Sequence, residues 1–107
     1  MSALSPECRT IQKNTSKIID AITNQSDPST FSLQLVENDF ISSQSANGIV
    51  QTMGLSNFNK VSQLMQAVES QIRTTSNTTA TFETFIIILR NLSLGALADQ
   101  LVQFYSK

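Results

Sequence analysis

The most apolar stretch of the chain lies in its last third, between residues 81 and 92. Apolar residues recur there at the spacing of a helix: Phe82, Phe85, Ile86 and Leu89. Ile87 and Ile88 continue the apolar surface around the other side. A helix that is apolar nearly all round is surrounded by other elements, so the pattern predicts a central helix with residues 86–89 buried at the heart of the domain.

A second apolar face follows after a joint that contains Gly95. It is formed by Leu97, Ala98, Leu101 and Phe104, which share one side of a short predicted helix. A buried helix with a short closing helix beside it indicates a compact all-α domain.

Hydrophobic periodicity predicts four earlier helices, so the domain has six in all. Their expected bounds are about 6–23, 29–38, 43–53, 57–73, 80–92 and 95–105. The first helix has an apolar face formed by Leu4, Cys8, Ile11, Thr15, Ile18 and Ile22. Short loops between helices of this length favour an antiparallel bundle.

Capping residues support several of these boundaries. Ser5 precedes Pro6 at the start of the first helix, which is a typical N-terminal signal. Ser29 or Thr30 is expected to cap the second helix and Ser42 the third. Gly54 is expected to terminate the third helix.

The remaining apolar residues are assigned to the core. The third helix is expected to turn Ala46, Ile49, Val50 and Met53 inward, and the fourth has a stripe formed by Phe58, Val61, Leu64, Met65, Val68 and Ile72. Phe40 and Ile41 are expected to plug the core from a connection. Truncation of a packed phenylalanine such as Phe58, Phe82 or Phe85 is expected to cost about 3–5 kcal/mol.

Composition narrows the classes of function. The 107 residues include no histidine and one cysteine, Cys8, and the net charge is −1. Histidine catalysis and histidine metal ligation are therefore excluded. Phosphate-binding glycine loops and paired carboxylate motifs are missing, so we expect no enzyme, no catalytic residue, no metal and no cofactor. No secretory signal or membrane-spanning run is visible, and we expect a cytoplasmic protein that binds neither nucleic acid nor membrane.

Basic residues follow the first helix at intervals of four. Arg9, Lys13 and Lys17 form a stripe beside the apolar face. Such a stripe is either a solvated surface or a binding surface. Only 14% of the residues are charged, and a polar surface with so little charge repels copies of itself weakly.

Three segments resemble the caspase-recruitment domains (CARD) of the death-fold superfamily. They are residues 35–42, residues 60–65, and the spacing Phe82-x-x-Phe85-x-x-x-Leu89 followed by Leu94, Leu97, Ala98 and Leu101. The likeness spans almost the whole chain. The second to fourth helices here have less charge than the family usually has. A conventional death domain usually has a tryptophan in its core, and this chain contains none, so the resemblance is to the recruitment domains rather than to that sibling family.

The resemblance implies a six-helix Greek-key bundle that binds other CARD or death-fold domains, including copies of itself. In this family a basic surface of the first and fourth helices meets an acidic surface of the second and third. By this resemblance the basic face would comprise Arg9, Lys13, Lys17, Lys60 and Arg73. The acidic face would comprise Asp27, Glu37 and Asp39. Because the two faces differ, the contact would be head-to-tail and would propagate into a filament or close into a ring.

The function expected from the resemblance is homotypic assembly of an apoptotic or innate-immune signalling complex. The chain would act as an adaptor or inhibitor, or as part of a larger receptor or caspase. One alternative is a helix-turn-helix nucleic-acid binder that uses the third helix, although that helix contains no lysine or arginine. Another is a small ligand carrier with a cavity inside the bundle.

Overall fold

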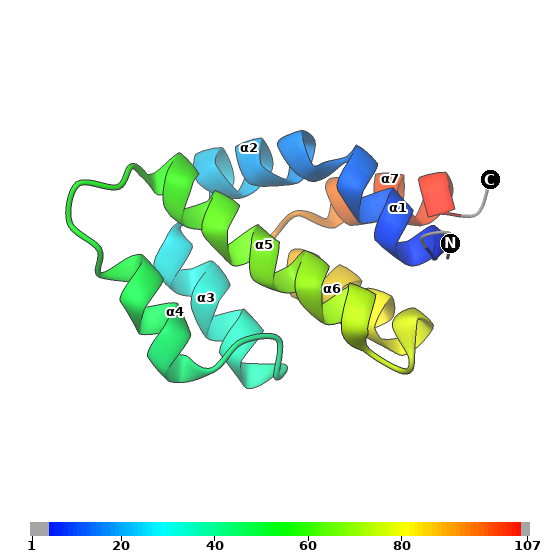
Figure 1. Ribbon diagram of the computed structural model, residues 1–107. Coiled ribbons are helices and arrows are strands. Elements are labelled where there is room, and N and C mark those ends of the chain that lie inside the picture. Colours follow the sequence, from blue (N-terminus) through cyan, green and yellow to red (C-terminus); the bar gives the residue numbers. More distant parts are fainter. Residues whose placement is uncertain (1–4, 106–107) are drawn as a thin grey trace.

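The computed structural model describes residues 5–105, which form seven α-helices and no strand. The helices are α1 (Pro6–Lys13), α2 (Thr15–Gln25), α3 (Pro28–Glu37), α4 (Ser43–Val50), α5 (Asn57–Thr74), α6 (Thr78–Asn91) and α7 (Gly95–Tyr105). Apart from the consecutive pair α1 and α2, each helix runs roughly opposite to the one before it (Figure 1). The prediction of a compact all-α fold is confirmed.

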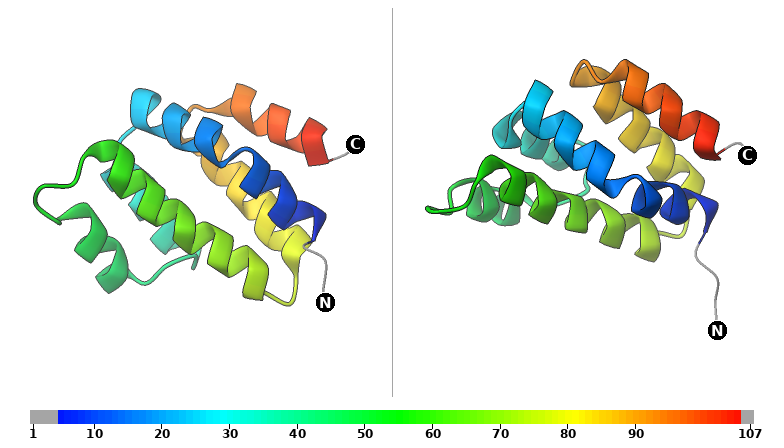
Figure 2. Two further views of the ribbon diagram at one scale, coloured as in Figure 1. Left: turned by 45° about the horizontal axis from the view of Figure 1, so that its top comes forward. Right: turned by 90° about the horizontal axis from the view of Figure 1, so that it is seen from above.

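Helix α5 is the axis of the bundle, because it packs against α1, α2, α3, α4 and α6. In Figure 1, α1 and α2 lie above α5, α3 and α4 lie below it, and α6 and α7 lie behind. The start of α1, the α5–α6 turn and the end of α7 meet at one end of the bundle. The α4–α5 connection, residues 51–56, forms the opposite end (Figures 1 and 2).

The first expected helix is interrupted, and this is why seven helices replace the predicted six. The break falls at Asn14, whose φ of −114° and ψ of 10° leave the helical region. The Asn14 side chain donates to the carbonyl of Thr10, and the Thr15 hydroxyl donates to the carbonyl of Ile11, both at 2.8 Å. Side chains that bond to nearby backbone carbonyls compete with the regular helix. The two halves are separated by one residue, so the bundle still has six rods.

Side-chain caps fix most of the helix starts. Ser5, Ser42 and Ser56 accept hydrogen bonds from backbone N–H groups at the starts of α1, α4 and α5. The expected cap of α3 is wrong, because Asp27 accepts from the N–H of Thr30 at 2.7 Å and α3 begins at Pro28. The carboxylate of aspartate suits this place because it lies at the positive end of the helix dipole.

Two helices end in a Schellman motif without glycine. After α3 the chain turns at Asp39 (φ 63°), where the N–H of Phe40 bonds to the carbonyl of Leu35 at 2.9 Å. After α6 it turns at Ser93 (φ 65°), where the N–H of Leu94 bonds to the carbonyl of Leu89, also at 2.9 Å. A left-handed conformation is unfavourable for a residue with a side chain. Gly95 begins α7, whose bounds agree with the predicted 95–105.

Replacement of Ser93 by glycine is expected to increase the free energy of unfolding by about 0.5–1 kcal/mol, because it removes the steric cost of the left-handed backbone. Chemical denaturation of the two proteins measures the difference. The opposite change at Gly54, which has φ 86°, provides the control, since Gly54→Ala should destabilise the fold. If Ser93→Gly loses stability, the assignment of strain to this turn is wrong.

The core joins all of the rods and matches most of the predicted apolar set. Its largest fully buried side chains are Phe31, Phe85, Ile11, Ile18, Ile22, Leu35, Leu64, Met65, Ile72, Ile88, Leu89 and Leu101. Phe40 is buried as predicted, and Cys8 is a buried small residue of α1. Leu4 of the predicted first face lies outside the described residues.

The prediction that α6 is the central helix with residues 86–89 buried is wrong in two respects, because α5 is the axis of the bundle and one of the four residues is exposed. Ile86, Ile88 and Leu89 are buried, but Ile87 is 55% exposed. Ile87 lies one helical turn from the exposed residues Glu83 and Asn91, so the three form a solvent-facing stripe along α6. Helix α3 reaches this stripe only at Asn91, whose side chain donates to Gln34 Oε1 at 3.3 Å, and α7 borders Ile87 without burying it.

The α4–α5 region also departs from the predicted packing. Helix α4 ends at Val50, three residues early, so Met53 lies in the connection and is 95% exposed rather than turned inward. For the same reason Gly54 does not terminate the helix. Phe58, in the first turn of α5, is 45% exposed because it projects at the end of the bundle. Phe104 of the closing helix is also exposed, at 40%.

Candidate functional site

The predicted basic residues lie on the side of the bundle formed by α1, α2 and α5. Arg9 and Lys13 are exposed one turn apart on α1, and Lys17 is exposed on α2 beyond the break. Lys60 and Arg73 occupy opposite ends of α5, about 20 Å apart along its axis. The five side chains therefore follow the length of the bundle and do not form one compact cluster.

Acidic residues interrupt this basic side. Asp20 is exposed on α2, one turn from Lys17. Glu69 of α5 accepts a hydrogen bond from Thr15 at 2.7 Å and so lies at the junction between α2 and α5. The charge of this side is therefore mixed, although basic residues predominate.

The predicted acidic residues belong to the two ends of α3. Glu37 and Asp39 are exposed at its C-terminal end, whereas Asp27 caps its N-terminal end, about 15 Å away along the helix. The Asp27 carboxylate already accepts from the N–H and the hydroxyl of Thr30, at 2.7 and 3.0 Å. The structure thus brings Glu37 and Asp39 together and leaves Asp27 apart.

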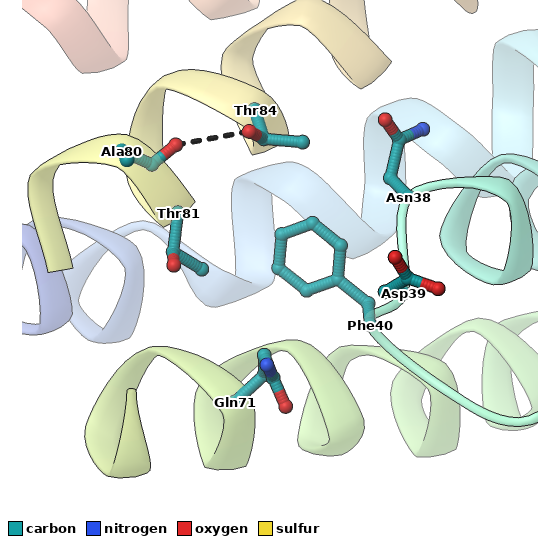
Figure 3. Close-up of a pocket in the computed structure, with 7 residues that line it drawn as sticks. All are labelled: Asn38, Asp39, Phe40, Gln71, Ala80, Thr81 and Thr84. Carbon is teal, nitrogen blue, oxygen red and sulfur yellow. Dashed lines mark hydrogen bonds between the residues drawn. The ribbon is translucent and has the colours of Figure 1, made fainter. Parts of the chain in front are cut away.

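Asp39 is exposed because the turn after α3 directs its side chain to the surface and that of Phe40 into the core. Figure 3 shows the Phe40 ring pointing between α5 and α6, while the Asp39 carboxylate points away from the ring. The Phe40 ring meets Phe85 edge to face, with centroids 6.4 Å apart. The left-handed conformation of Asp39 therefore places one side chain in the core and the next at the surface.

Phe40 and Asp39 border a small hollow of about 140 Å³ between the α3–α4 turn, α5 and α6 (Figure 3). The hydroxyls of Thr81 and Thr84 in this hollow donate to carbonyls of their own helix, those of Asn77 and Ala80. Because both hydroxyls already donate to backbone carbonyls, we assign no ligand to the hollow.

A buried carboxylate joins three helices at the end of the bundle where α1 begins. Glu7 is only 4% exposed, and its Oε2 accepts hydrogen bonds from Thr79 Oγ1 and Tyr105 Oη, both at 2.8 Å. These partners lie in the first turn of α6 and at the last residue of α7. The carboxylate therefore connects α1, α6 and α7.

The same contacts determine how Glu7 titrates. Burial raises the pKa of Glu7, but hydrogen bonds from its own backbone, Tyr105, Thr79 and Thr78 outweigh burial and leave the pKa below its ordinary value of 4.5. The hydrogen bond to this carboxylate raises the pKa of Tyr105. Glu7 is thus held as a charged, fully bonded group.

Sequence reasoning missed this role for Glu7. The role depends on Thr79 and Tyr105, which lie far from Glu7 along the chain. One available signal was composition, since Tyr105 is the only tyrosine of the chain and a partly buried tyrosine hydroxyl usually has a hydrogen-bond partner.

The other chemical groups of the described chain are arranged for packing. Burial raises the pKa of the Cys8 thiol, which keeps it protonated and unreactive. Within residues 5–105 no group of three or more acidic or cysteine side chains is arranged to hold a metal ion. No helix of that range is long and apolar enough to cross a membrane.

Comparison with known proteins adds no relative: no family model, no curated protein and no solved structure matches this chain.

Proposed function

We propose that the chain is a non-enzymatic homotypic interaction module of the CARD type, which assembles head-to-tail in an apoptotic or innate-immune signalling complex. In this proposal the six rods, with α1 and α2 counted as one broken helix, form the Greek-key bundle of the death fold. Its partners are other death-fold domains, including copies of this chain.

The observation that supports the proposal most is the separation of opposite charges. Exposed basic residues predominate on α1 and α2, whereas Glu37 and Asp39 project from the end of α3 on the other side of α5 (Figure 1). A basic surface on one side and an acidic surface on another allow one copy to bind the next in the same orientation. Charge pairs of this kind set register and association rate more than affinity.

The proposed contact is narrower than the one expected from the sequence. Glu37 and Asp39 form its acidic part, because Asp27 lies at the other end of α3 and its carboxylate is occupied by Thr30. Arg9, Lys13 and Lys17 form its basic part.

Reversal of two basic charges tests the proposal. The double change Lys13→Glu and Lys17→Glu is expected to increase the concentration needed for assembly at least about tenfold, because it places like charges opposite Glu37 and Asp39. Light scattering and negative-stain microscopy over a concentration series measure assembly, and circular dichroism verifies folding. Filaments that form as readily as those of the wild type would contradict the assignment of this surface.

A second variant separates lost charge from lost folding. Asp39→Gly removes an acidic charge but also relieves the left-handed backbone at that position. It is therefore expected to be at least as stable as the wild type and yet to assemble less readily. Impaired assembly in a protein of raised stability would exclude misfolding as the cause.

A further inference from the structure

The surface between α6 and α7 contains an apolar groove that the proposed charge contact does not use. The groove has a volume of about 340 Å³ and lies between Phe82, Ile86 and Ile87 of α6 and Val102 of α7. Ile87 is 55% and Val102 is 37% exposed. Among the described residues, Glu83 is the only charged one that lines the groove. Exposed apolar surface rimmed by polar groups commonly marks an interaction site.

Two of the three polar side chains that line this groove already make hydrogen bonds inside the molecule. The hydroxyls of Thr79 and Tyr105, at one end of the groove, both donate to Glu7. A small-molecule site normally offers polar groups that orient its ligand. The groove therefore suits an apolar side chain of a protein better than a polar small molecule.

An exposed apolar segment that could fill this groove projects from the opposite end of the bundle. The α4–α5 connection exposes Met53 almost completely, and Phe58 follows it in the first turn of α5. Lys60 is the only charged residue between positions 40 and 68. The projection is thus apolar at its tip and has a single positive charge beside it.

We propose that the α4–α5 connection of one copy docks into the α6–α7 groove of a second copy of this chain. The apolar side chains of Met53 and Phe58 would cover Ile87 and its neighbours, and Lys60 would lie against Glu83. This inference rests on the self-association proposed above and adds a second contact to it. The alternative is that a different protein occupies the groove, and the experiments below distinguish it from a second copy of this chain.

The positions of the two surfaces determine the kind of assembly. The α4–α5 connection forms one end of the bundle, while Thr79 and Tyr105 place the groove toward the other end (Figures 1 and 2). Two different surfaces at opposite ends produce a head-to-tail contact that leaves a free projection and a free groove on every pair. The contact is therefore open-ended.

A charge exchange tests the pairing of Lys60 with Glu83. Lys60→Glu and Glu83→Lys are each expected to increase the concentration for half-maximal assembly at least about tenfold, because each places like charges together. The two changes in one chain are expected to restore assembly to within about threefold of the wild type. If the double variant assembles no better than either single variant, the pairing is wrong.

A mixing experiment tests the apolar contact and its direction. Met53→Asp disables the projection, and Ile87→Asp disables the groove; both positions are exposed, and circular dichroism verifies folding. Each variant alone is expected to assemble poorly, because the charge contact that remains sets register and association rate more than affinity. An equimolar mixture should form pairs through the groove, because one intact projection meets one intact groove. Ala96→Asp, which adds the same charge at the exposed start of α7, should assemble like the wild type.

The outcomes distinguish this contact from the function on which it rests. If the wild type assembles and neither Met53→Asp nor the charge exchange alters assembly, the groove contact is refuted while self-association stands; a groove reserved for a foreign protein would give this result. If the wild type remains a single chain at every concentration, self-association itself fails, and the groove contact fails with it.

Discussion

Truncation of Phe85 to alanine is expected to lower the free energy of unfolding by about 3–5 kcal/mol. The ring is fully buried in α6 and meets Phe40 edge to face, so its removal leaves a cavity between α6 and the α3–α4 turn. A domain of this size has a total stability of about 5–15 kcal/mol. The variant should therefore unfold at a much lower urea concentration than the wild type, as chemical denaturation would measure.

Phe58 provides the matched control for this prediction. It is also a phenylalanine in a helix, but it is nearly half exposed at the end of the bundle. Phe58→Ala should cost only about 1–1.5 kcal/mol, because nearly half of the side chain is already in contact with water. Equal losses in the two variants would contradict the burial pattern, and with it the position of α5 relative to the core.

Replacement of Glu7 by glutamine is expected to destabilise the fold by about 1.5–3 kcal/mol near neutral pH. A hydrogen bond to a charged group contributes more than one between neutral groups, and Glu7 accepts two such bonds from Thr79 and Tyr105. Glutamine also brings donor hydrogens toward groups that already donate. Thermal and urea unfolding at one pH measure the loss, with the exposed Glu37→Gln as a control that should change stability little.

The Glu7 carboxylate also predicts how stability depends on pH. The pKa of Glu7 in the folded protein lies below its ordinary value of 4.5. At a pH between the folded and the ordinary pKa, the unfolded chain therefore binds more protons than the folded one. Its contribution is therefore complete above pH 4.5 and is lost as the pH falls through the folded pKa. The wild type and Glu7→Gln should converge in stability as the medium is acidified. A difference that grows on acidification would contradict the hydrogen-bonded, charged state of Glu7.

The helices were largely predictable because their signals are local. Apolar spacing in α5 and the serine caps of α1 and α4 depend only on neighbours in the chain, and the structure confirms them. The break at Asn14 was missed because the apolar spacing continues across it, whereas the competition lies in side-chain bonds to backbone carbonyls. The spacing of apolar residues carries no information about such side-chain hydrogen bonds.

Burial at the surface of the bundle was less predictable, because it depends on where neighbouring helices end. Ile87 and Ile86 are identical in chemistry and adjacent in sequence, yet only Ile86 is covered. Met53 is exposed for the same reason, because α4 ends at Val50 and no helix carries Met53 toward the core. The candidate site was predictable to a similar extent. The sequence names the charged residues, but it does not show that Asp27 lies at the opposite end of α3 from Glu37 and Asp39.

The central claim, that copies of this chain join head-to-tail through different surfaces, is tested most directly by sedimentation velocity of the wild type over a broad concentration series. We predict that the weight-average mass rises continuously with concentration and reaches no plateau, since every added copy leaves both kinds of surface free. A single-chain mass at all concentrations, or growth that stops at a closed dimer, would contradict the account.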